Sequence, residues 1–200
     1  MNILEAIETR RAVKHFDPDH EMPEKDLETL LHAGRLAPTA FNIQHTRFLV
    51  VQDAELREKI KTASWDQAQV TDASVLIVVC ADLKAWEKQP ERYWRNAPEE
   101  VKGFMVGAIG QYYTGREQAQ RDEAMRSCGL AAQNLMLAAK ELGYDSCPMD
   151  GFDFEAVGEI IRLPEDHLIS MFVVVGKATQ PARERSGPLE PEEQICYDRF

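Results

Sequence analysis

The chain has 200 residues, of which 44% are hydrophobic and 28% are charged, as expected for one globular domain. A formal net charge of -11 disfavours nucleic-acid binding, and no run approaches the roughly 20 apolar residues that a membrane helix needs. The N-terminus has no signal-peptide core, so we expect a cytoplasmic protein without a nucleic-acid or membrane partner.

The cysteines and histidines show no spacing typical of a metal site. The four cysteines, at positions 80, 128, 147 and 196, form no CxxC pair, and the five histidines form no HExxH motif. No Ser/His/Asp or Cys/His arrangement is recognisable, so hydrolysis has no support. We therefore predict no bound metal, and we expect Cys128 and Cys147 to be small buried apolar side chains.

The first predicted elements are two helices. Ile3, Leu4 and Ile7 share one face of a short amphipathic helix near the N-terminus. A second helix is predicted over 23–37, because proline is favoured in the first turn and leucines recur at helical spacing. A loop is predicted over 38–45.

Two strands with a helix between them come next. Residues 47–52 are rich in β-branched and aromatic side chains, as strands are, and residues 53–64 favour a helix. The run over 75–81 is apolar on both faces. We therefore predict that this second strand lies in the middle of a sheet.

The region 84–120 has the weakest pattern, with aromatic residues scattered among charges. We expect helices with exposed aromatics there, forming an excursion from the core. A long helix over 126–142 is apolar nearly all round, so we expect it to be buried on several sides. The remaining elements are an extended piece over 144–148, a helix over 153–161, a core strand over 169–176 and a proline-rich, charged tail over 177–200.

The order of these elements predicts an α+β protein. We expect a single domain over residues 1–200 with one mixed central sheet flanked by helices. The sequence contains no internal repeat, and neither a GxGxxG nor a GxxxxGK[ST] phosphate-binding loop.

Positive charge is concentrated at two places in this acidic chain. Arg10, Arg11 and Lys14 follow the first helix, and Arg183 and Arg185 lie in the tail. One interpretation is that these cations complement a helix end and point into water, as charge runs usually do. The other is that both clusters hold one anion, since arginine binds phosphate through a planar, two-pronged donor face.

Four segments in register resemble the signatures of the FMN-dependent nitroreductase family. Residues 10–16 are similar to its RR-S-x-[RK]-x-F motif, 37–44 to its A-P-S-[SA]-x-N-x-Q motif and 148–152 to its P-[MI]-[EG]-G-F/Y segment. The strand end at 175–177, followed by two arginines, resembles its closing strand and phosphate-binding tail. The chain departs from the pattern at Ala12, Thr39, His45 and Thr46, which alters hydroxyl contacts near the flavin and the rim of the pocket.

The resemblance implies a homodimer with two FMN sites at the subunit interface and with C-terminal tails exchanged between subunits. The residues that match FMN contacts are Arg10, Arg11, Ala12, Lys14, Gln67, Gln69, Pro148, Met149, Asp150, Gly151, Arg183 and Arg185, with Pro38, Thr39, Ala40 and Asn42 from the other subunit. On the alternative interpretation, Gln67 and Gln69 are ordinary surface glutamines, and Asn42 with Gln44 only caps a loop.

The resemblance also implies roles within that site. The arginines would hold the FMN phosphate by charge-assisted hydrogen bonds, and Lys14, as the catalytic residue, would lie by the flavin N1 and C2 carbonyl edge. Backbone N–H groups of Asp150 and Gly151 would reach flavin N5, where glycine permits close approach. The substrate side would be lined by Phe41, Phe104, Tyr112 and Tyr113, unless these aromatics are ordinary packing.

The activity implied is the reduction of a small-molecule acceptor, such as a nitroaromatic or a quinone, by NADH or NADPH. Kinetics would be ping-pong, because reductant and acceptor would use the same place in turn. The region 84–120 would cover the flavin, and the tail 177–200 would wrap the partner subunit. Two alternatives stay open: a dehydrogenase or dehalogenase on the same fold, and a flavin-binding protein without turnover.

Overall fold

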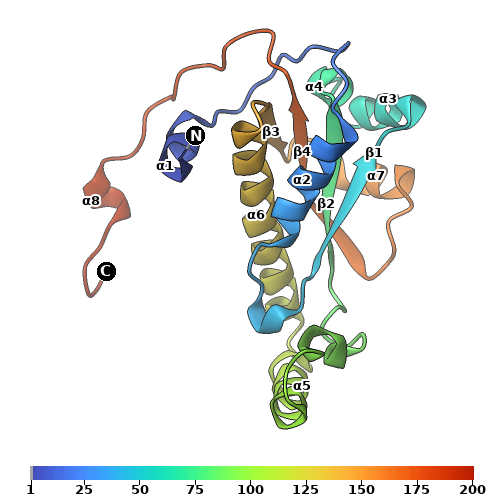
Figure 1. Cartoon of the computed structure of the whole chain (residues 1–200), viewed down its shortest axis with the longest axis vertical. Helices are drawn as coiled ribbons and strands as arrows, with labels where there is room; N and C mark the ends of the chain where they lie inside the picture. The colour runs from blue at the N-terminus through green and yellow to red at the C-terminus, as the bar shows by residue number, and fades with distance from the viewer. Residues whose placement is uncertain (1) are drawn as a thin grey trace.

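Four strands form the centre of the molecule, and helices cover both faces of their sheet (Figure 1). The structure is a computed structural model and describes residues 2–200. The strands are β1 (Thr46–Val51), β2 (Val75–Asp82), β3 (Asp145–Met149) and β4 (His167–Gly176), and they lie in the order β1-β2-β4-β3. One antiparallel sheet packed between helices confirms the predicted α+β class.

The pairing within the sheet differs from the mixed arrangement that we expected. The pairs β1–β2, β2–β4 and β3–β4 are all antiparallel. Within residues 2–200, the only parallel pairing is an isolated bridge between Ala12 and Ser146. The prediction for β2 is confirmed: it has a neighbour on each side and is buried along its whole length, because helices cover both of its faces.

Helices connect the strands and supply both covering layers. They are α1 (Ile3–Thr9), α2 (Glu24–Arg35), η1 (Ala40–Asn42), α3 (Ala54–Thr62), α4 (Gln69–Asp72), η2 (Pro90–Trp94), α5 (Glu99–Tyr113), α6 (Glu117–Glu141), α7 (Phe154–Ile160) and α8 (Pro191–Gln194). The side chains of Asn2, Asp53 and Asp153 cap α1, α3 and α7 by accepting hydrogen bonds from first-turn backbone N–H groups. No helix within residues 2–200 has both the length and the apolar character needed to cross a bilayer.

Each face of the sheet has its own hydrophobic core. On one face, α2 and α6 pack against alternate residues of β2 and β4, such as Ile77 and Val173. These two helices meet closely at Gly34, where an added Cβ would lie 2.8 Å from a methyl carbon of Leu135. The absence of a side chain at Gly34 therefore sets how closely α2 approaches α6.

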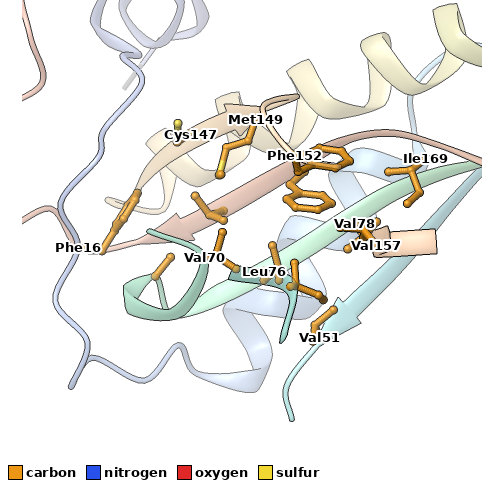
Figure 2. Close-up of a cluster of buried hydrophobic side chains, with 14 of the residues drawn as sticks. Phe16, Val51, Val70, Leu76, Val78, Cys147, Met149, Phe152, Val157 and Ile169 are labelled. Carbon is orange, nitrogen blue, oxygen red and sulfur yellow. The ribbon is translucent and has the colours of Figure 1, made fainter. Parts of the chain in front are cut away.

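The opposite core lies beneath α3, α4 and α7 and is closed by the N-terminal segment (Figure 2). Phe152 stacks on Phe172 with ring centroids 3.9 Å apart and ring planes 5° apart. Val13 and Phe16 are buried at its edge and hold residues 10–16 against the sheet. The core therefore fixes the segment that carries the first cationic cluster.

Three sequence-based expectations are wrong. Helix α6 begins at Glu117 rather than at residue 126, because its first turns are polar and carry no apolar pattern. The apolar face of α1 is not buried: Ile3 is 61% exposed and Leu4 is 67% exposed. In the region 84–120, Trp86 is buried rather than exposed, since it stacks against another aromatic ring in a small third core.

Candidate functional site

Residues 10–16 lie along the edge of the sheet beside β3. The backbone N–H of Val13 donates to the carbonyl of Ser146 at 3.1 Å, and Phe16 forms a bridge with Ala178. The buried side chains of Val13 and Phe16 face the core, while Lys14 is exposed on the outer side. Strand alternation therefore holds the cations of this segment at the surface.

The C-terminal tail docks on the same segment through its arginines. The guanidinium of Arg11 donates to the carbonyl oxygen of Arg183, and that of Arg185 donates to the carbonyl oxygen of Glu8 at 3.1 Å. Both bonds end on neutral backbone carbonyls, so neither positive charge is neutralised. Beyond this contact the tail leaves the sheet and runs past α1 (Figure 1).

The two cationic clusters line one cleft of about 1110 Å³. Its lining includes Arg10, Arg11, Ala12, Lys14, Gln69, Arg183 and Arg185. Glu184 also lines it, but within residues 2–200 no carboxylate forms an ion pair with these five cations. Burial lowers the pKa of Arg10, and the neighbouring charges of Arg185 and Arg11 lower it further. Crowded, unpaired cations of this kind are typical of an anion site.

The segment at Asp150 and Gly151 adjoins two of the predicted glutamines. Gln67 donates to the carbonyl oxygen of Gly151 at 2.8 Å, and Gln69 donates to the side-chain oxygen of Gln67 at 2.9 Å. These amides are therefore not independent surface side chains, because they form a hydrogen-bonded chain from the cleft to residue 151. Asp150 is exposed and Gly151 is half-buried beside it.

The other members of this set have mixed environments. Ala12 is exposed in the cleft and Pro148 is half-buried, whereas the side chain of Met149 is buried in the sheet core. Only the backbone of Met149 is therefore left for contact with a ligand. Cys128 and Cys147 are both buried, as expected from their apolar character.

Trp65 lies at this site and was not identified from the sequence. Its side chain is 71% exposed, and a Cβ added to Gly151 would lie 2.9 Å from its ring. Trp65 and Asp66 both have a φ of 54°, a left-handed conformation that is costly for a bulky residue. A lone tryptophan between two helices follows no periodic pattern, so nothing in the sequence distinguishes it from a packed aromatic.

A second group of predicted residues lies at the far end of α2. Phe41 and Asn42 have φ values of 53° and 57°, and the loop is held by bonds from Asn42 to the Tyr93 carbonyl at 2.9 Å and from the Gln44 N–H to the Thr39 hydroxyl at 3.0 Å. A 12-residue helix spans about 18 Å, so α2 separates this loop from the cationic cleft. Within one chain the structure does not bring Pro38, Thr39, Ala40 and Asn42 to the cleft.

The predicted substrate aromatics gather beside that loop. Phe41 lies 5.6 Å from Tyr112 between ring centroids, and Phe104 is 74% exposed on α5. Tyr113 was wrongly predicted to line the substrate side. Its side chain is fully buried beside Trp86 and Ile109, so it supports the exposed rings from beneath.

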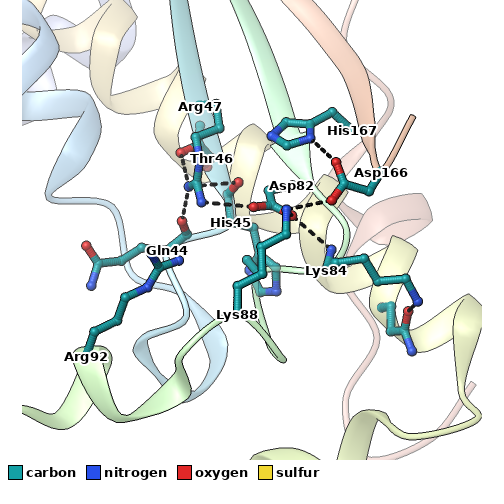
Figure 3. Close-up of polar contacts among 12 residues, drawn as sticks. Gln44, His45, Thr46, Arg47, Asp82, Lys84, Lys88, Arg92, Asp166 and His167 are labelled. Carbon is teal, nitrogen blue, oxygen red and sulfur yellow. Dashed lines mark hydrogen bonds and ion pairs between the residues drawn. The ribbon is translucent and has the colours of Figure 1, made fainter. Parts of the chain in front are cut away.

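A separate polar cluster ties the 84–98 region to the sheet (Figure 3). The buried carboxylate of Asp82 pairs with Arg47 at 3.1 Å and with Lys88 at 2.9 Å, and Lys88 also reaches Asp166 at 2.6 Å. Asp82, Asp166 and His167 lie close enough together to share a cation. The ammonium of Lys88 already fills that position, so this cluster is an ion-pair network.

Comparison with known proteins agrees with this geometry. The profile of the nitroreductase family matches residues 7–177. Protein DrgA of Synechocystis is 54% identical over 188 residues, which is 93% of this chain and 90% of that protein. MhqN of Bacillus subtilis, described as an NAD(P)H nitroreductase, is 32% identical over 92% of this chain and 93% of its own length.

Solved structures agree along nearly the whole chain. A nitroreductase structure from Bacillus subtilis has a TM-score of 0.89 at 32% identity and covers 97% of both chains. A nitroreductase from Exiguobacterium sibiricum in complex with FMN has a TM-score of 0.90 at 28% identity, covering 98% of this chain and 97% of that one. Because the family profile spans most of the sequence and relatives match both in sequence and in fold, the chain belongs to the nitroreductase family.

Proposed function

We propose that this protein is an FMN-dependent oxidoreductase that uses NADH or NADPH to reduce electron-poor acceptors such as nitroaromatics or quinones. The observation that carries the proposal is the cleft in which Arg10, Arg11, Arg183 and Arg185 converge without a carboxylate partner within residues 2–200. Family relatives described as NAD(P)H nitroreductases and a related structure in complex with FMN support it.

The donor set of the cleft fits FMN. Guanidinium groups from both clusters are free to donate to a phosphate, and such charge-assisted bonds are roughly twice as strong as neutral ones. Lys14 supplies a cation that would favour negative charge on the flavin pyrimidine edge. Gly151 lacks a side chain where a ligand must come close, and Gln67 with Gln69 fixes the local backbone.

A complete site would need two subunits. The loop at residues 38–42 and the exposed rings of Phe41 and Tyr112 are about the length of α2 away from the cleft of the same chain. Exposed apolar side chains on α1 and the tail need a cover: Ile3, Leu4, Ile7, Leu189, Ile195, Tyr197 and Phe200. A homodimer that buries them would bring the loop and aromatics of one subunit to the cleft of the other.

In this site, bound FMN would supply the redox chemistry. The chain supplies position and field: the arginines hold the anionic end, and Lys14 places positive charge beside the reacting ring. Trp65 and the partner's copies of the exposed aromatics would shield the ring from water and offer flat faces for planar substrates. Because reductant and acceptor would occupy the same place in turn, we expect ping-pong kinetics.

The decisive experiment is anaerobic reduction of the FMN-loaded protein with NADH and with NADPH. We expect at least one nucleotide to bleach the flavin absorbance, and a panel of nitroaromatics and quinones to restore it. Initial rates over a grid of both substrates should give parallel double-reciprocal lines. If neither nucleotide bleaches the flavin, the protein is a flavin binder without this activity and the proposal fails.

A further inference from the structure

Cys147 is a buried thiol directly beside the cationic segment. It lies in β3, is 1% exposed, and follows Ser146, whose carbonyl accepts the N–H of Val13 at 3.1 Å. This pairing places the chain around Lys14 next to Cys147. The thiol is therefore held at a fixed distance from the cleft by two backbone elements rather than by its own side chain.

The sulfur has polar contacts on two sides. It donates to the carbonyl oxygen of Pro148 at 3.4 Å, and the Lys14 side chain forms a hydrogen bond with it. Burial raises the pKa of Cys147, while the charges of Lys14 and Arg10 oppose that rise without cancelling it. The group is therefore a neutral thiol that offers its S–H to Pro148 and its lone pairs to the ammonium of Lys14.

Lys14 depends on this contact for its place. Its residue is exposed, and within residues 2–200 it makes no ion pair with a carboxylate. A lysine stem has four rotatable bonds and about 2 kcal/mol of rotamer entropy, so an unanchored ammonium would occupy many positions. A single acceptor at its tip removes much of that freedom.

Resting on the proposed function, we propose that Cys147 is a positioning residue whose thiol anchors the Lys14 ammonium and so sets the redox potential of the bound flavin. The sulfur also touches the carbonyl of Pro148, which precedes the segment at Asp150 and Gly151. Cys147 thereby links the cation on one side of the cleft to the backbone on the other.

The competing explanation is that Cys147 only fills space, and Cys128 provides the matched comparison. Cys128 is equally buried and donates to a backbone carbonyl, that of Cys80, at 3.3 Å. It lies in the core on the opposite face of the sheet, away from the cationic cleft. A purely packing role predicts similar consequences for Cys128→Val and Cys147→Val.

The test compares Cys147→Val, Cys147→Ser and Cys128→Val for three properties: the midpoint potential of bound FMN, FMN affinity and the melting temperature of the apoprotein. Cys147→Val should shift the flavin toward the oxidised form by about threefold in its reduction equilibrium, equivalent to about 14 mV for a two-electron couple. Cys147→Ser keeps an acceptor for Lys14 and should retain most of the potential. Cys128→Val should leave the potential unchanged.

Lys14→Met provides the second arm. If Cys147 acts through Lys14, the shift caused by Cys147→Val should disappear in the Lys14→Met background. An unchanged potential in Cys147→Val, or an equal shift in both backgrounds, would overturn the inference. Should Cys147→Val fail to fold, Cys147→Ser with and without Lys14→Met decides the same question, since an equal potential offset in both backgrounds excludes action through Lys14.

The potential can be measured by chemical reduction, so this result does not depend on NADH or NADPH. Failure of both nucleotides to reduce the flavin would refute the proposed function while leaving the Cys147 measurement intact. A normal reduction rate with no change of potential in Cys147→Val would refute the positioning role and leave the proposed function standing.

Discussion

Replacing both Arg183 and Arg185 by alanine should weaken FMN binding far more than riboflavin binding. The two ligands share the ring system and differ in the phosphate, so the comparison isolates the anionic end. In the structure, these tail arginines face Arg10 and Arg11 across the cleft, and the charge of Arg185 lowers the pKa of Arg10. A phosphate would relieve this crowding of like charges as well as receive hydrogen bonds.

The size of the effect follows from the number of bonds and their exposure. A hydrogen bond to a charged group contributes about 1.5–3 kcal/mol, so two would contribute about 3–6 kcal/mol. Both tail arginines are exposed in the single chain, which favours the lower limit. We therefore expect a loss of about 3 kcal/mol, or about 100-fold in the Kd of FMN.

Flavin fluorescence quenching would measure both affinities with the apoprotein at fixed ionic strength. Arg199→Ala is the matched control, because Arg199 lies in the same exposed tail but does not line the cleft. A salt series should show a shallower dependence for FMN in the double variant, as two cations are missing. Equal weakening of FMN and riboflavin would refute the phosphate assignment.

Three further predictions concern assembly and stability. Light scattering should show a homodimer, with an interface above the roughly 2,000 Å² typical of permanent pairs, and a stable flavin-loaded monomer would refute this. Burial lowers the pKa of His45 to about 4, so stability present above pH 6.5 should be lost as pH falls from 6.5 toward 4, by about 3 kcal/mol in all; urea unfolding of His45→Gln should lack this slope. Asp82→Asn should cost about 2 kcal/mol in urea unfolding, below the value for a fully buried pair because Arg47 and Lys88 are 40% and 39% exposed, whereas Glu58→Gln at a surface pair should change little.

Local patterns were sufficient where burial is uniform along an element. The run that became β2 is apolar on both faces, and it is the inner strand that such a pattern predicts. The charge clusters were equally informative, because an acidic chain gains nothing from gathering arginines at random. Their meeting in one cleft was a prediction that the docking of Arg185 on Glu8 confirms.

Tertiary contacts decided what the sequence could not. The exposed polar start of α6 has no apolar stripe, so its first turns carry no signal. Tyr113 is chemically like its neighbour Tyr112, and only the packing of α5 on Trp86 buries one and exposes the other. The strain at Trp65 comes from a turn between two short helices and has no counterpart in composition.

The docking of the tail has a consequence for how freely this protein can change during evolution. Arg11 and Arg185 donate to the backbone carbonyls of Arg183 and Glu8 rather than to side chains. Every amino acid carries such a carbonyl, so substitutions at position 8 leave the acceptor in place. Selection can therefore retune the surface charge around the cleft while the two arginines that join tail and N-terminal segment keep their partners.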